Sequence, residues 1–129
     1  MTKKELGAWG ETKAIEYLTK IGYTLLAKNF QIKEGEVDLI MQNPDQNISL
    51  IEIKTRQIDT LETPTEKDYA ASAEELSTSL NKAKVTKILK AGLAWQDKNK
   101  SNKTISVEFL IVFKTHKDTY FQHIPDIDV

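Results

Sequence analysis

Apolar and polar positions repeat with two different periods along the chain, and the change of period predicts where helices and strands lie. Residues 3–21 have apolar side chains at helical intervals, between a Thr2-x-x-Glu5 capping box and a stop at Gly22. Short apolar runs further along predict strands, which we place at 23–26 with 29–32, 37–41, 51–54, 104–114 and 119–124.

A second helical pattern interrupts these strands, from residue 72 or 73 to about 97. Ser72-x-x-Glu75 is its candidate cap, and Val85 and Ile88 begin its apolar face. The resulting order α-β-β-β-α-β-β predicts an α/β domain, with a mixed sheet covered by helices on both sides.

Charged side chains occur inside two of the predicted strands. Ionised groups resist burial unless they are paired or hold a metal, so Asp38 in one strand and Glu52 with Lys54 in the next indicate a site. Turn-forming residues separate the two strands and predict a hairpin. If Asn43 and Asn47 close a three-residue loop, Asp38 lies opposite Glu52 and Lys54 shares their face.

Two carboxylates at that spacing favour a bound cation. About 5 Å apart, they repel by roughly 3 kcal/mol at an effective dielectric of about 20. A hard divalent ion such as Mg²⁺ or Mn²⁺ offsets this repulsion, and the Lys54 ammonium is placed to act on a nearby water or phosphate. The alternative interpretation makes Asp38 and Glu52 solvated edge positions, with Lys54 as a simple counter-ion.

Three segments together resemble a known family. They are Gly7-x-x-Gly10-Glu11, Gly35-Glu36-Val37-Asp38-Leu39-Ile40 and Ile51-Glu52-Ile53-Lys54-Thr55-Arg56. The chain resembles the YraN family of largely uncharacterised bacterial proteins, which are similar to PD-(D/E)XK nucleases and to archaeal Holliday junction resolvases. The resemblance runs from residue 6 to 56. It implies a restriction-endonuclease-like fold, with α/β/α layers around a central mixed β-sheet.

The same resemblance implies roles for individual residues. Asp38 and Glu52 become metal ligands together with the main-chain carbonyl of Ile53, and Lys54 becomes the residue at the attacking water. Glu11 corresponds to a helix carboxylate beside the metal, although its spacing alone favours a surface glutamate. The family usually ends in an Arg-aromatic-Asp strand, whereas this chain has Val-Glu-Phe at 107–109.

Charge is segregated along the second half of the chain, although the formal net charge is −1. The acidic segment 57–72 predicts a mobile loop, whereas Lys84, Lys87 and Lys90 share one side of the second predicted helix. These lysines and Arg56 are candidate contacts for nucleic-acid phosphates. A solvated helix face is the alternative for the lysines, and a salt bridge to the acidic segment is an equal rival for Arg56.

Length and composition bound the remaining possibilities. With 129 residues, 29% of them charged, the chain suits a single domain over 1–129. Its apolar run at 109–113 is shorter than the roughly 20 residues that span a bilayer, and its start lacks a signal-peptide core. We therefore expect a cytoplasmic protein without a membrane segment.

Three functions are compatible with these patterns. The leading hypothesis is a metal-dependent endonuclease that acts on DNA, including branched or distorted DNA. The alternative is a non-catalytic nucleic-acid-binding module with a nuclease-like fold, and the third is a protein-interaction domain that uses its acidic segment. A resolvase-like activity would need two active sites and therefore a homodimer.

Overall fold

A five-stranded mixed sheet organises the described part of the chain. The computed structural model describes residues 1–58 and 64–125, apart from the side chains at 72–73 and 76–79. The strands stand in the order β1-β2-β3-β4-β5, with β3 and β4 parallel and the other neighbours antiparallel. The described elements are α1 Lys3–Lys20, β1 Thr24–Ile32, β2 Gly35–Gln42, β3 Ile48–Gln57, α2 Glu66–Ser79, α3 Lys82–Lys98, β4 Ile105–Lys114 and β5 Thr119–Ile124.

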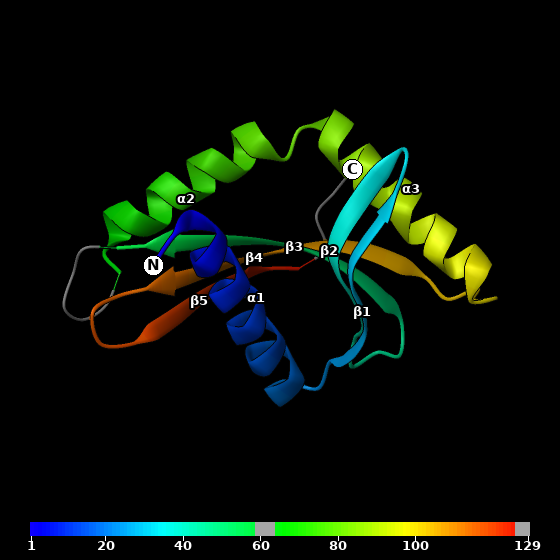
Figure 1. Cartoon of the computed structure of the whole chain (residues 1–129), viewed down its shortest axis with the longest axis horizontal. Coiled ribbons are helices and arrows are strands. Elements are labelled where there is room, and N and C mark those ends of the chain that lie inside the picture. The colour runs from blue at the N-terminus through cyan, green and yellow to red at the C-terminus, as the bar shows by residue number, and fades with distance from the viewer. Residues whose placement is uncertain (59–63, 126–129) are drawn as a thin grey trace.

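Helices cover both faces of this sheet, as the sequence predicts (Figure 1). Alternate side chains of a strand point to opposite faces, so Leu39 packs with α1 residues such as Leu18, whereas Ile40 packs with α3 residues such as Ile88. Helix α2 joins the α3 side, where its Tyr69 ring meets the Phe113 ring of β4 at 5.2 Å between centroids. The architecture is an α/β sandwich compatible with a nuclease-like fold.

The single second helix predicted for 72–97 is wrong, because two helices occupy this region. The side chain of Asn81 accepts a hydrogen bond from the Lys84 amide at 2.9 Å and starts α3 there. Helix α2 starts at Glu66, where Thr65 and Asp68 exchange hydrogen bonds between side chain and backbone. The acidic loop predicted over 57–72 is therefore too long. Residues 66–72 are helical, and residues 59–63 lie outside the described part of the chain.

The β2–β3 hairpin has the predicted register. Asn43 donates its amide to the Asn47 carbonyl at 2.9 Å, and the Asn43 side chain accepts the amides of Asp45 and Asn47. Leu39 then pairs with Ile51, which is the last pair of the ladder toward the open end of the hairpin. The next two positions, Asp38 and Glu52, therefore lie where the paired strands begin to separate.

Helix α1 approaches this end of the sheet closely at one glycine. A Cβ atom added to Gly10 would overlap the Thr55 hydroxyl and would lie 2.9 Å from the Thr55 Cβ atom. Gly7, one turn earlier, differs: among the described residues a Cβ atom there meets nothing within 4 Å. Gly10 thus sets the distance between α1 and β3, whereas Gly7 leaves open space beside Glu11.

Substitution of these two glycines separates close packing from helix propensity. We expect Gly10→Ala to destabilise the protein by about 1–3 kcal/mol, because the added methyl group must displace Thr55. Gly7→Ala is the matched control and should be neutral or stabilise the protein by up to about 1 kcal/mol, because alanine favours an exposed helix position. Urea unfolding of both variants measures this difference, and equal free energies of unfolding would contradict it.

Candidate functional site

Asp38 bridges the two strands just beyond the last pair of the ladder. Its Oδ2 atom accepts a hydrogen bond from the backbone amide of Ile53 at 2.9 Å. The Asp38 carboxylate therefore satisfies the Ile53 amide at a position where the β2 backbone no longer pairs with β3. This bond holds the Asp38 carboxylate against β3 next to Glu52.

Glu52 is largely buried beside Asp38. Its side chain is 14% exposed. Burial, the negative charge of Asp38 and a hydrogen bond to Asp38 raise the pKa of Glu52 to about 8, while the Lys84 ammonium partly opposes this shift. The Lys84 Nζ and Glu52 Oε1 atoms are 3.9 Å apart. The predicted convergence of the two acids is confirmed, and the pair is short of positive charge.

This donor set fits a hard divalent cation. Two adjacent carboxylates supply the oxygen ligands that Mg²⁺ and Mn²⁺ prefer, and such ions complete their coordination with water and substrate oxygens. The raised pKa of Glu52 shows that its negative charge is disfavoured beside Asp38, and a cation bound between the two carboxylates would relieve this repulsion. Within the described residues, no group of three or more acids, histidines or cysteines gathers closely enough to hold a metal ion. The Ile53 carbonyl stays a predicted ligand.

A cavity of about 590 Å³ opens beside the acid pair. Asp38 lines it together with Glu11 from α1 and with Lys54 and Arg56 from β3. The Glu11 carboxylate accepts a hydrogen bond from the Asn29 side chain at 3.1 Å. The structure thus brings Glu11 to the same cavity as Asp38 without making it part of a three-acid cluster. Its role beside a metal remains a prediction.

The two cations of β3 are both paired with Glu75 of α2. Lys54 Nζ lies 3.2 Å from Glu75 Oε1, and the Arg56 guanidinium contacts the other carboxylate oxygen. Arg56 therefore forms a salt bridge, as its alternative interpretation expects, but with Glu75 of α2 and not with the acidic segment 57–72. The sequence predicts Glu75 only as part of a helix cap, since its partners lie about 20 positions earlier in the chain. A spatial contact of this kind leaves no periodic signal.

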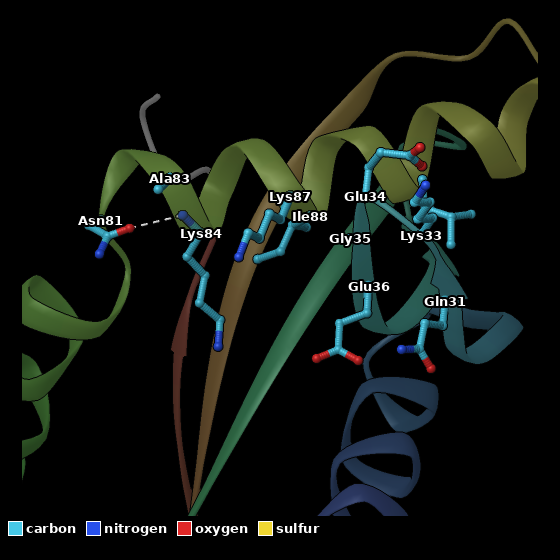
Figure 2. Close-up of a pocket in the computed structure, with 11 residues that line it drawn as sticks. Gln31, Lys33, Glu34, Gly35, Glu36, Asn81, Ala83, Lys84, Lys87 and Ile88 are labelled. Carbon is cyan, nitrogen blue, oxygen red and sulfur yellow. Dashed lines mark hydrogen bonds between the residues drawn. The ribbon is translucent and has the colours of Figure 1, made fainter.

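A second groove, of about 480 Å³, lies between α3 and the tip of the β1–β2 hairpin. Figure 2 shows Lys84 and Lys87 extending from α3 along this groove, which Glu36 also lines. Lys84 links the groove to the acid pair through its contact with Glu52. Lys90 is exposed one turn further along α3 and lies outside the groove. Two of the three lysines predicted to bind phosphates therefore line this groove, and Lys84 also contacts the acid pair.

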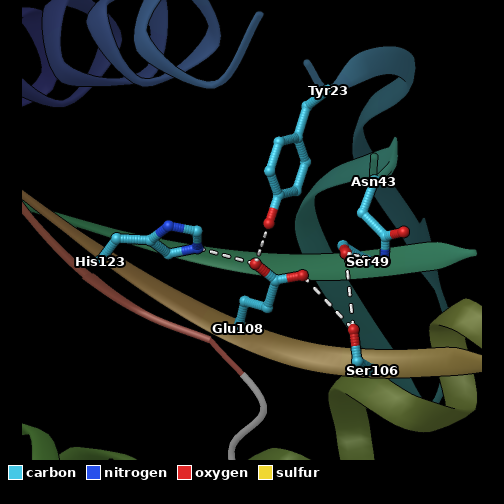
Figure 3. Close-up of polar contacts among 6 residues, drawn as sticks. All are labelled: Tyr23, Asn43, Ser49, Ser106, Glu108 and His123. Atoms are coloured by element: carbon cyan, nitrogen blue, oxygen red, sulfur yellow. Dashed lines mark hydrogen bonds and ion pairs between the residues drawn. The ribbon is translucent and has the colours of Figure 1, made fainter. Parts of the chain in front are cut away.

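Glu108, in the strand that departs from the family pattern, belongs to a separate buried network (Figure 3). It is 2% exposed and bonds at 2.7 Å with both the Tyr23 hydroxyl and the His123 ring. Burial raises the pKa of Glu108, but hydrogen bonds led by His123 outweigh it and leave the pKa below its usual value. Phe109 pairs with Glu52, so Glu108 faces the opposite side of the sheet. The network connects β4 to β5 and to Tyr23 and is separate from the acid pair.

The raised pKa of Glu52 predicts a pH-dependent stability in the metal-free protein. Above pH 4.5 the unfolded chain releases the Glu52 proton, whereas the folded protein retains it up to about pH 8. The stability gained from this proton should therefore be complete below pH 4.5 and lost as the pH rises to 8. We expect Glu52→Gln to abolish this loss, which is on the order of a few kcal/mol.

Urea unfolding in a chelating buffer at pH 5 and pH 8 measures this effect. Glu66→Gln, at an exposed position of α2, is the control and should keep the wild-type pH dependence. If Glu52→Gln loses as much stability between the two pH values as the wild type, the raised pKa is wrong.

Comparisons with known proteins place the chain in one family. The family described as "Uncharacterised protein family UPF0102" matches residues 10–114. A UPF0102 protein of Campylobacter concisus is 31% identical over 123 residues, which cover 95% of this chain and 93% of that protein. A relative from Vibrio parahaemolyticus is 32% identical over 86% of this chain and 81% of its own length.

Shorter matches show higher identity. A UPF0102 protein of Syntrophomonas wolfei is 44% identical over 63 residues, which cover 49% of this chain and 54% of that protein, so the chain matches about half the length of that relative. The family match spans Asp38, Glu52 and Lys54, and the match to the Campylobacter concisus protein covers nearly the whole of both proteins. The chain therefore belongs to the UPF0102 family, which is the YraN family that its three motifs indicate.

Proposed function

We propose that this protein is a metal-dependent endonuclease that hydrolyses phosphodiester bonds of DNA. The observation that carries the proposal is the convergence of Asp38 and Glu52 at the end of the β2–β3 ladder, where burial and the charge of Asp38 raise the pKa of Glu52. Lys54 lines the same cavity as Asp38. Asp38 and Glu52 thus offer ligands for a cation, and Lys54 offers an amine, next to a cavity that can admit a substrate.

The chemistry is the addition of water across a phosphorus–oxygen bond. Hydroxide is transferred to phosphorus, and the leaving oxygen takes up a proton. Bound Mg²⁺ or Mn²⁺ would neutralise charge on the phosphate and make a nearby water more acidic. Asp38 and Glu52 would hold the ion, and the Lys54 ammonium would orient the attacking water or stabilise the negative charge that develops on the phosphate. Glu11 would stand beside the metal ion, on the α1 side of the cavity.

The neighbouring basic side chains support a polymeric substrate. Arg56 lines the cavity beside Asp38, whereas Lys84 and Lys87 line the groove on the α3 side. Phosphates of one DNA strand follow one another at a regular spacing, so a strand that enters the cavity can also meet the groove. The resemblance to resolvases favours DNA over RNA and favours branched or distorted DNA. Cutting both strands of such a substrate would require two copies of the chain.

Cleavage assays test the proposed chemistry directly. With Mg²⁺ or Mn²⁺ the purified protein should cut branched or single-stranded DNA, and Asp38→Ala or Lys54→Ala should each slow cutting by about 100-fold or more. Asp45→Asn, in the exposed hairpin turn, is the control and should cut at the wild-type rate. Full cutting by both Asp38→Ala and Lys54→Ala would contradict the proposal.

Salt-dependent binding tests the predicted DNA contacts without any cleavage. Each phosphate contact with duplex DNA contributes about 0.9 to the slope of log K against log salt concentration. Lys87→Ala should therefore weaken binding and lower this slope by roughly that amount. Lys117→Ala, in the exposed turn before β5, should leave the slope unchanged. If DNA binds in this way but is never cut, the binding-module alternative is correct.

A further inference from the structure

Glu75 holds both cations of β3 that face the proposed reaction site. The Lys54 Nζ atom is 3.2 Å from one carboxylate oxygen, and the Arg56 guanidinium contacts the other. Lys54 and Arg56 also line the cavity beside Asp38, and Arg56 and Glu75 together line a smaller cavity of about 380 Å³. The Glu75 carboxylate thus bridges the Lys54 ammonium and the Arg56 guanidinium, which both lie beside Asp38.

A carboxylate in this position resembles a phosphate because both present negatively charged oxygen atoms to the two cations. Both groups present two or more anionic oxygens to a guanidinium and an ammonium, and charge-assisted hydrogen bonds form equally with either. We propose that Glu75 occupies the place of a substrate phosphate and competes with it for Lys54 and Arg56. The identity of that phosphate as part of DNA rests on the proposed function.

The exposure of the two ion pairs favours such an exchange. Among the described side chains of α2, Tyr69 meets the Phe113 ring of β4. The side chains in the ion pairs are 31–46% exposed, so water screens both pairs. Exposed ion pairs of this kind contribute little to stability. Glu75 can therefore leave the two cations at a low free-energy cost.

The competition makes Glu75 a specificity-determining residue. A tethered carboxylate acts at a high effective concentration, so a single phosphate ion displaces it poorly. A DNA strand that also contacts Lys84 and Lys87 gains additional binding energy and overcomes the competition. Glu75 thus disfavours small phosphates and selects a polyanion long enough to reach both the cavity and the groove.

Removing the Glu75 charge tests this inference in the intact protein. Binding of inorganic phosphate and of a 20-nucleotide single strand is measured in a chelating buffer, so that no cleavage takes place. We expect Glu75→Gln to bind phosphate about three- to tenfold more tightly than the wild type, because two exposed ion pairs no longer compete. The tightening should be smaller for the oligonucleotide, which already outcompetes Glu75. Glu66→Gln, on the same helix, should bind both probes as the wild type does.

Two results would overturn the inference. Equal phosphate affinity in Glu75→Gln and Glu66→Gln would show that Glu75 does not compete, and weaker binding in Glu75→Gln would show that it positions Lys54 instead. Glu75→Ala should repeat the tightening, and thermal unfolding verifies that each variant is folded. The proposed function fails separately: if no variant cuts DNA with Mg²⁺ but Glu75→Gln still binds phosphate more tightly, the competition stands without the endonuclease.

Discussion

The repulsion between two neighbouring carboxylates is the constraint around which the end of this sheet is arranged. The β2 and β3 backbones separate after the Leu39–Ile51 pair, and Asp38 then accepts the Ile53 amide in place of a backbone carbonyl. That bond holds one acid against the strand that carries Glu52. Closing the strands further would remove the space for a ligand, whereas opening them would separate the acids. The helices pack on both faces of the sheet that holds this acid pair.

Alternate side chains of β3 point to opposite faces of the sheet, so the two helical layers meet different side chains of this strand. On the α1 side, Ile53 packs in the core and Thr55 meets Gly10. On the other side, Glu52, Lys54 and Arg56 follow one another and each meets an opposite charge from α2 or α3. Glu75 thus supplies one carboxylate to both Lys54 and Arg56, and the Lys84 ammonium stands opposite Glu52. Any polyanion or cation that binds there has to replace an internal ion pair.

The hairpin and the acid pair could be predicted from sequence because their determinants are local. Turn-forming residues between 43 and 47 fix the register, and a period of two then places Asp38 and Glu52 on one face. The break between α2 and α3 is harder to predict, because the apolar face begins only at Val85 and leaves the residues before it without a clear period, although Asn81 is a good capping residue. The partners of Glu75 and Glu108 are set by tertiary packing, and one chain without its relatives contains no pairwise signal for them.

The short turn between β2 and β3 has a consequence for how this chain can vary. If the strands rather than the turn absorbed one residue inserted between Asn43 and Asn47, β2 would slide past β3 by a single position and its side chains would change faces. Val37 or Leu39 would then stand beside Glu52, while the amino-acid composition would hardly differ. The length of this turn is therefore as much a determinant of the acid pair as the carboxyl groups themselves.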